Sequence, residues 1–587
     1  MQKTVLIIGG GVAGLTAAQE LVSRGYTVTV IEPHPLVGGK AKSISKAGTG
    51  VGSNYDLPGE HGFRIFPGFY RHLIDTMRSI PYGNKSVADN LRTTREAYIS
   101  DEEHGPMLIS NNFRGRLNMF VDILLGRHYL HQIGISQMEI ELFFKKLWRV
   151  ATSCQQRRDY ELDGISWWEF TEADTCSLEY REQLVINATK TLVASDPRRA
   201  SVRTIGAIAI QTINDLLRYQ NNSDRVLCGP TNDVWLTPWY SLLKDKGVIF
   251  EHSYSAETLQ FKGKNIFGIE CNVLGQETKT VFTADYFVLA TPIEVSAELV
   301  KPLQHIDDQF VDMQVLSTMT SWMNGIQYYL LNDVPIANGH EILPRTAWAL
   351  TAISQAQFWQ KFDLTDYGDG TVKGIISVDI SDWSTPGLLL NKTAMECTPE
   401  EVAQEVWYQL KQAINTRYSQ LLTDTNLHSW FLDPDIQRSE QNPHVNINLE
   451  PLLVNLINSW ELRPLPTTKL TNLFLAADYV KNNTDLATME GANEAAKRTV
   501  NAILDCDASK AKRCSIYPLH EFWYLRLLQS YDSYRYNRGF PWKQSPPLIL
   551  RWPVSLFLFC YRTTQFFNTH KAPAAFETFT ERKESKV

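Results

Sequence analysis

The sequence lacks the signatures of several common kinds of catalytic or structural site. Its 8 cysteines form no CxxC pair and no local framework, which argues against a zinc site and a disulfide scaffold and favours a reducing compartment. It contains no Walker loop, no convincing nucleophile triad and no set of histidines with metal-ligand spacing. The sequence therefore predicts no metal site, and any difficult chemical step would fall to an organic cofactor.

Positive charge is also scarce over most of the chain. The net charge of −7 gives no general attraction to nucleic acid, and 43% hydrophobic with 21% charged residues is ordinary for a folded protein. The apolar start, Thr4 to Leu21, lacks the basic leader and small-residue cleavage site of a secretory signal. We therefore expect the protein to lie on the cytoplasmic side of the membrane. The 587 residues predict at least two domains, because domains usually stop growing at roughly 250 to 300 residues.

What the chain does contain is a dinucleotide-binding fingerprint at its start. Val5–Ile8 is a short apolar run typical of a buried parallel strand, and it leads directly into the glycine-rich turn Gly9–Gly14. Apolar residues at helical spacing follow, and Gly25 ends the predicted helix. A second strand is predicted to alternate from Tyr26 to Ile31 and to close at Glu32.

Each glycine of this fingerprint has a physical task. Gly9 allows the tight turn, Gly11 lets the backbone approach a pyrophosphate, and Gly14 lets helix and strand pack closely. The diphosphate would lie at the helix N-terminus, against Val12 and Ala13, where free N–H groups and the helix dipole favour an anion. Strand, turn, helix and second strand in register predict dinucleotide binding far more strongly than the glycines alone.

Glu32 predicts which nucleotide the fingerprint binds. A carboxylate at the end of the second strand can accept hydrogen bonds from the adenosine ribose hydroxyls. The same negative charge disfavours a 2′-phosphate, which argues against NADP at this site.

A second glycine pair follows Glu32 within reach of the same cofactor. The run Gly38-Gly39-Lys40-Ala41 makes this region resemble the flavin amine oxidase superfamily. A lysine and an alanine after the glycine pair are closer to plant and cyanobacterial phytoene desaturases than to amine oxidases, where arginine usually follows. The resemblance implies a Rossmann-type α/β fold and FAD as the cofactor, with these four residues beside it.

A block far downstream resembles the flavin-binding segment of the same superfamily. Asn472–Tyr479 is predicted as a strand ending in a carboxylate, and a helix is predicted from about Asn493 to Leu504. In the superfamily this block holds the flavin ribityl chain and pyrophosphate. The resemblance implies cofactor contacts for Asp478, Met489, Glu490, Gly491 and Ala492.

The order of these blocks predicts a cofactor domain that is discontinuous in sequence. Lys246–Phe250 and Ala284–Pro292 resemble the strands that complete the family's cofactor domain. We assign residues 1–90, 225–295 and 460–505 to the FAD-binding domain. Residues 91–224 and 296–459 are assigned to the substrate domain.

The segment Gly59–Tyr70 supplies the catalytic candidates. It is similar to the part of the desaturases that passes by the isoalloxazine ring, which implies His61, Arg64 and Tyr70 for the flavin-facing wall. Arg64 could anchor a substrate carboxylate or stabilise reduced flavin, and His61 could exchange a proton; buried structural hydrogen bonds are the alternative. His61 and Arg64 depart from the family pattern, so the reaction can differ from carotene desaturation.

Residues 506–587 form a basic tail that is rich in aromatic residues. The tail carries a net charge of +7 and leaves −14 on the rest of the chain. Its run Trp552–Tyr561 is apolar but too short to span a bilayer, which needs about 20 residues. The tail could be an amphipathic membrane-interface element that delivers lipophilic substrates, or a pair of amphipathic helices that wrap the substrate domain.

These observations predict an FAD-dependent oxidoreductase that desaturates or isomerises carbon–carbon bonds of a lipophilic, isoprenoid or carotenoid-like substrate. The expected event is hydride transfer from a C–H bond to flavin N5. An unsaturated fatty acid desaturase or isomerase, an amine oxidase and a non-catalytic flavin-containing lipid-binding protein are the alternatives. The sequence does not identify the electron acceptor.

Overall fold

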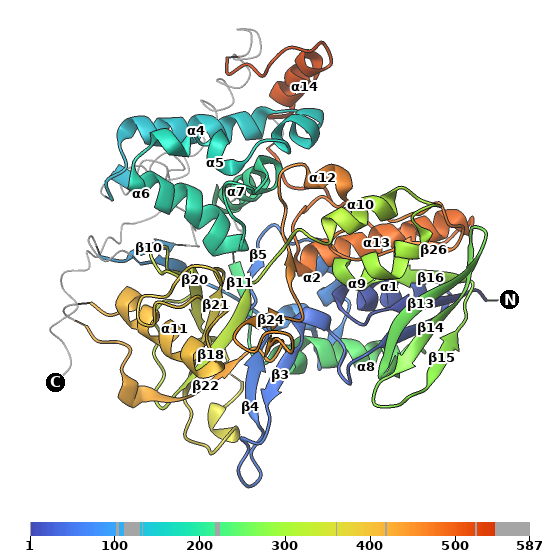
Figure 1. The fold of residues 1–587 in the computed structure, drawn as a ribbon, viewed down its shortest axis with the longest axis horizontal. Helices are drawn as coiled ribbons and strands as arrows, with labels where there is room; N and C mark the ends of the chain where they lie inside the picture. The colour runs from blue at the N-terminus through green and yellow to red at the C-terminus, as the bar shows by residue number, and fades with distance from the viewer. Residues whose placement is uncertain are drawn as a thin grey trace.

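The fold is described from a computed structural model of the chain (Figure 1). The structure describes residues 2–100, 105–110, 130–131, 133–217, 224–359, 361–416, 419–522 and 525–545.

A five-stranded parallel sheet lies at the centre of the cofactor-binding half, on the right of Figure 1. Its first two strands pair in parallel from Thr4↔Thr27 to Ile8↔Ile31, and every residue from Val5 to Ile8 is buried. Apolar runs without alternation suit such strands, because both faces of a parallel sheet are covered. In spatial order the strands are β12 (Ile249–His252), β2 (Thr27–Glu32), β1 (Thr4–Ile8), β16 (Tyr286–Leu289) and β26 (Leu473–Leu475).

Helices and a second sheet cover the two faces of this sheet. One face packs against α1 (Val12–Val22), α8 (Thr237–Asp245) and α13 (Met489–Cys506). The other face packs against α9 (Ile293–Val300), α10 (Gln309–Leu316) and an antiparallel sheet of β13 (Tyr254–Lys262), β14 (Asn265–Val273) and β15 (Lys279–Phe282).

A seven-stranded mixed sheet forms a second region, at the lower left of Figure 1. One face packs against α11 (Pro399–Ile414). The other face packs against Leu57 and Phe63 of the cofactor-binding half. In spatial order the strands are β10 (Met107–Ser110), β9 (Glu96–Ile99), β19 (Glu341–Ile342), β20 (Leu350–Ser354), β21 (Gly374–Ile380), β18 (Asn324–Leu330) and β22 (Leu427–Leu432).

A helical region at the upper left of Figure 1 carries the described part of the tail. It contains α4 (Gln137–Thr152) and α7 (Val202–Leu217), and the tail helix α14 (Leu525–Tyr536) packs against the C-terminal end of α4. Leu525 and Leu528 are buried against Ala151. The Nε atom of Arg157 lies 2.9 Å from an oxygen of Asp532, with both side chains almost fully buried.

The position of α14 concerns the expectation that the tail packs on the protein as helices. Residues 525–536 pack on the protein as a helix. The run Trp552–Tyr561, for which a membrane-interface element is predicted, lies outside the described residues. Among the helices that the structure describes, none is long and apolar enough to cross a bilayer.

Candidate active site

Two glycine-rich turns meet at the carboxyl end of β1 and build the floor of the predicted cofactor site. The amide of Gly38 donates a hydrogen bond to the carbonyl of Gly10 over 2.8 Å. Gly9 has a φ of +102°, and a Cβ atom on Gly14 would lie 1.9 Å from the carbonyl oxygen of Gly9. A Cβ on Gly39 would lie 3.2 Å from the Cα of Gly11. Side chains would fill the space between the turns, so this backbone geometry fits a bound diphosphate.

The first turn of α1 points into the same place. Gly11 is the N-cap residue, and no side chain caps the helix. The N–H groups of the first turn, which include those of Val12 and Ala13, have no partners within the helix and can donate to a phosphate. This chain therefore supplies the predicted anion site from backbone atoms.

Glu32 lies at the carboxyl end of β2 beside this turn and is buried. One carboxylate oxygen accepts a hydrogen bond from the Gly10 amide over 2.8 Å, and the other accepts one from the His34 amide over 3.1 Å. These bonds fix the carboxylate, and each oxygen keeps a lone pair that a ribose hydroxyl can use.

Lys40 lies near Asp478, the residue that the resemblance predicts beside the ribityl chain. Lys40 donates to the carbonyl of Pro451 and lies 3.7 Å from Glu450 and 4.0 Å from Glu294. Burial raises the pKa of Asp478, although Lys40 and Arg463 oppose that rise. Partly buried carboxyls with a nearby cation suit the hydroxyl groups of a ribityl chain.

Arg64 is held by its own chain. Its guanidinium pairs with Glu60 and donates to the carbonyls of Gly62 over 2.9 Å and Lys40 over 2.8 Å, and also toward Lys42. The Arg64 and Glu60 side chains are only 8% and 4% exposed. Of the roles that we considered for Arg64, this geometry favours the structural one, since both terminal nitrogens of its guanidinium already have acceptors.

His61 joins a group of aspartates that the sequence analysis missed. Its Nδ1 atom lies 2.7 Å from Asp433 and 3.5 Å from Asp435. Burial lowers the pKa of His61, but the contacts with the two aspartates outweigh that effect and raise it to about 9. His61 is therefore a cation at neutral pH. The three ligand atoms lie within 4.8 Å of one another, a spacing that a metal ion could also use, so the absence of a metal stays a prediction.

Asp379 completes the polar group beside the segment 60–64. It lies on β21, and its carboxylate accepts a hydrogen bond from the amide of Phe63 over 3.3 Å. Burial raises the pKa of Asp379 to about 7, against the opposing effects of Phe63, His61 and Arg64. A charged residue inside the otherwise buried strand Gly374–Ile380 is the one sequence signal that could have revealed it.

Tyr70 lies apart from this polar group. Its ring packs edge-on against Phe66 and Phe69 within the core beneath the central sheet. Burial raises the pKa of the Tyr70 phenol above its ordinary value, so the group stays neutral. The structure thus brings His61 close to Arg64 and places Tyr70 elsewhere, among aromatic side chains and beside Thr488 at the start of α13.

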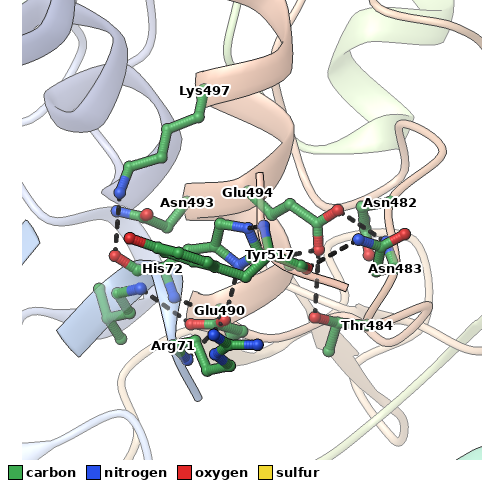
Figure 2. Close-up of polar contacts among 12 residues, drawn as sticks. Arg71, His72, Asn482, Asn483, Thr484, Glu490, Asn493, Glu494, Lys497 and Tyr517 are labelled. Atoms are coloured by element: carbon green, nitrogen blue, oxygen red, sulfur yellow. Dashed lines mark hydrogen bonds and ion pairs between the residues drawn. The ribbon is translucent and has the colours of Figure 1, made fainter. Parts of the chain in front are cut away.

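The N-terminus of α13 begins four residues before the predicted start of the helix. Thr488 caps it by accepting a hydrogen bond from the amide of Gly491. Figure 2 shows the carboxylate of Glu490 turned toward α2 (His72–Arg78), where it accepts three amide hydrogen bonds of 2.8 Å each, from Arg71, His72 and Leu73. The Glu490 side chain is therefore fully used within the protein. Cofactor contact by Met489, Glu490, Gly491 and Ala492 stays a prediction.

A mainly apolar wall adjoins the Glu60–Arg64 pair. It encloses a cavity of about 20 Å³, room for about one water molecule. The apolar side chains that line it are Phe63, Val226, Leu227, Ile353, Phe358 and Trp359.

Comparisons with known proteins agree with this architecture. Residues 7–80 match the model of an NAD(P)-binding Rossmann-like domain, and residues 267–504 match that of a flavin containing amine oxidoreductase. A zeta-carotene desaturase from Synechocystis sp. is 22% identical over 537 residues, which cover 85% of this chain and 97% of that protein. A carotenoid phi-ring synthase from Chlorobaculum tepidum is 37% identical over 82 residues, 14% of this chain and only 12% of that protein.

The fold is shared with solved structures. Cyclohexylamine oxidase from Brevibacterium oxydans superposes with a TM-score of 0.54 over 86% of this chain and 99% of that chain, at 14% identity.

Fold and site together define a flavin-dependent oxidoreductase that binds FAD at a Rossmann-type sheet. The chain is similar to the flavin amine oxidase superfamily over residues 267–504 and has similarity to a carotenoid desaturase over most of its length.

Proposed function

We propose that the protein removes or relocates hydrogen on carbon–carbon bonds of a lipophilic, isoprenoid or carotenoid-like substrate. FAD, when bound, supplies the hydride acceptor. The chain's own residues orient the substrate and hold the protons at the wall formed by the segment 60–64 and the sheet strands opposite it.

The main support for this proposal is that the guanidinium of Arg64 is already hydrogen-bonded within the protein. Arg64 donates to Glu60 and to backbone carbonyls, so it has no free donor pair for a substrate carboxylate. Most of the other side chains that line the cavity beside this ion pair are apolar, and Thr231 and Gln355 are the polar ones. Such a wall favours a hydrocarbon over a fatty acid whose head group would need a cation.

His61 and Asp379 are the groups that can hold a proton near the wall. His61 is a clamped cation with a pKa of about 9, whereas the carboxyl of Asp379 has a pKa of about 7. A group that titrates near neutral pH can both accept and return a proton. We therefore propose Asp379 as the exchanging group and His61 as a fixed positive charge beside it.

An amine oxidase is the second candidate. The observation that favours it is the acidic group of Asp379, Asp433 and Asp435, which would attract an ammonium substrate. His61 and Arg64 already supply two positive charges there, so this attraction is partly cancelled.

The test is anaerobic titration of the FAD-loaded protein while its absorption spectrum is recorded. Separate titrations use a carotene mixture in detergent, an unsaturated fatty acid and a primary amine. Bleaching of the oxidised flavin bands by the carotenes alone supports the proposal, as does conversion of the carotenes with persistent bands, which indicates isomerisation. Bleaching by the amine or the fatty acid alone refutes it.

We also propose that the tail beyond residue 545 brings the protein to a membrane surface where such substrates dissolve. Residues 546–587 carry six Lys and Arg against three Asp and Glu, and this positive charge and the aromatic residues support the proposal, because both favour an anionic interface. Co-sedimentation with vesicles of phosphatidylglycerol and phosphatidylcholine tests it. The full chain should sediment and a chain ending at residue 545 should not; equal sedimentation of the two would refute it.

A further inference from the structure

The segment after α13 crosses the cofactor-binding half without regular secondary structure, and we call residues 507–522 the strap. The backbone amide of Cys514 donates a hydrogen bond to the side chain of Asn501 over 2.7 Å. The same side chain donates to the carbonyl of Cys514 over 3.0 Å. Further along, the carbonyl of His520 accepts hydrogen bonds of 2.9 Å from Gln211 and Asn214 of α7. The strap therefore links α13 to the helical region.

The side chain of His72 connects the strap to the cofactor-binding half through hydrogen bonds to both. Its Nε2 atom accepts a hydrogen bond from the amide of Tyr517 over 2.8 Å, so this nitrogen carries no proton. The proton of the neutral ring is then on Nδ1, which lies 2.8 Å from the carboxylate of Glu490. One imidazole thus joins the strap to Glu490, as Figure 2 shows.

Other contacts hold the same part of the strap. Asn483 donates to the carbonyl of Tyr517 over 2.8 Å, and the amide of Asn483 donates to Glu494 of α13 over 2.8 Å. The guanidinium of Arg71 lies 4.6 Å from the centre of the Tyr517 ring. The strap is consequently bonded on both sides, to α2 and to the loop that precedes α13.

Glu490 connects this joint to the cofactor site. It is the second residue of α13, and its carboxylate caps the N-terminus of α2. Its backbone belongs to the helix turn that the family resemblance predicts to lie against the flavin ribityl chain and pyrophosphate. Any movement of His72 or α2 is transmitted to that turn, because Glu490 is 2% exposed and packed on all sides.

We infer that the strap is a cofactor-retention element, whose docking and FAD binding reinforce each other through Tyr517, His72 and Glu490. The inference rests on the FAD binding of the proposed function and on the predicted contact between FAD and the start of α13. Because coupling between two binding events is reciprocal, FAD must hold the strap as strongly as the strap holds FAD. A strap that merely covers the surface would show neither effect.

Limited proteolysis of the wild-type protein tests one direction. Lys510, Lys512 and Arg513 are exposed in the strap and offer trypsin sites. Removal of FAD should increase the rate of cleavage there by about tenfold, within the range of typical coupling energies. Equal cleavage rates with and without FAD, in a protein whose FAD binding is confirmed by titration, overturn the inference.

A matched pair of variants tests the other direction. Tyr517→Pro removes both the aromatic ring and the amide that His72 accepts from, whereas Tyr517→Ala removes the ring only. The dissociation constant of FAD, from flavin fluorescence, should rise about tenfold more in Tyr517→Pro than in Tyr517→Ala. Equal constants overturn the inference, and far-ultraviolet circular dichroism checks that both variants fold. If the wild-type protein does not bind FAD in the titration, the proposed cofactor site is refuted. If it binds FAD but the two variants have equal dissociation constants, only the role of the strap is refuted.

Discussion

The contacts of His61 with Asp433 and Asp435 predict how the free energy of unfolding depends on pH. Replacement of His61 by Gln removes a positive charge that lies 2.7 Å from Asp433 and 3.5 Å from Asp435. The folded protein holds the pKa of His61 at about 9, whereas an unfolded chain has an ordinary value of about 6.5. A raised histidine pKa stabilises the fold fully below about pH 6.5, and this contribution is lost as the pH rises through about 9.

The size of this effect follows from the two pKa values. At about pH 6 the charged His61 contributes about 3 kcal/mol to the free energy of unfolding, because one pKa unit is worth about 1.4 kcal/mol. At about pH 10 the contribution is close to zero. Urea unfolding followed by tryptophan fluorescence should therefore show a wild-type advantage over His61→Gln that shrinks by about 3 kcal/mol between these pH values.

A surface histidine supplies the control. His428 pairs with Asp369 over 3.2 Å, and Asp369 is 43% exposed, so His428→Gln should change the unfolding free energy by less than about 1 kcal/mol. Parallel pH profiles for wild type and His61→Gln would refute the reasoning. Repeating the series after dialysis against a chelator separates an ion pair from a metal site, because only a metal site would lose stability on chelation.

Three further outcomes follow from the geometry. Gly14→Ala should abolish flavin content after purification, because its Cβ would lie 1.9 Å from a carbonyl oxygen; normal flavin absorbance in that variant would contradict the predicted cradle. Arg64→Met should destabilise the fold by about 3 to 5 kcal/mol by leaving Glu60 buried without its cation, while Arg64→Lys costs less; denaturant midpoints compare the two. Asp532→Asn should weaken the docking of α14 by about 3 kcal/mol, since Arg157 stays buried, and faster tryptic cleavage after Arg535 and Arg538 measures this release.

Local sequence patterns were sufficient to predict the centre of the fold. The strand before the glycine turn, the helix after it and the second strand ending in Glu32 occur where predicted, because their periodicity and glycine content act over a few residues. The start of α13 was placed too late. The cap at Thr488 fixes that boundary through a single side-chain hydrogen bond, which apolar periodicity does not reveal.

The proximity of His61 to Asp379, Asp433 and Asp435 could not be predicted from local sequence patterns. Asp379 and Asp433 lie more than 300 residues from His61 in the sequence and reach it only when the seven-stranded sheet packs against the cofactor-binding half. The occupied state of Arg64 was also not predictable, since its acceptors are backbone carbonyls whose positions depend on the turn at residues 40–42. Long-range packing therefore determines the electrostatics of the wall.

The strand order of the central sheet has a consequence for synthesis in the cell. Its edge strand β26 begins at Leu473, and α13, which packs against α1, ends at Cys506. The sheet that contains Thr4–Ile8 and its helical cover therefore stay incomplete until the ribosome has translated more than four fifths of the chain, roughly half a minute to a minute and a half at about 5 to 20 residues per second. During that time the nascent chain exposes surface that aggregates readily, and we expect its yield to depend on chaperones that bind the emerging amino terminus.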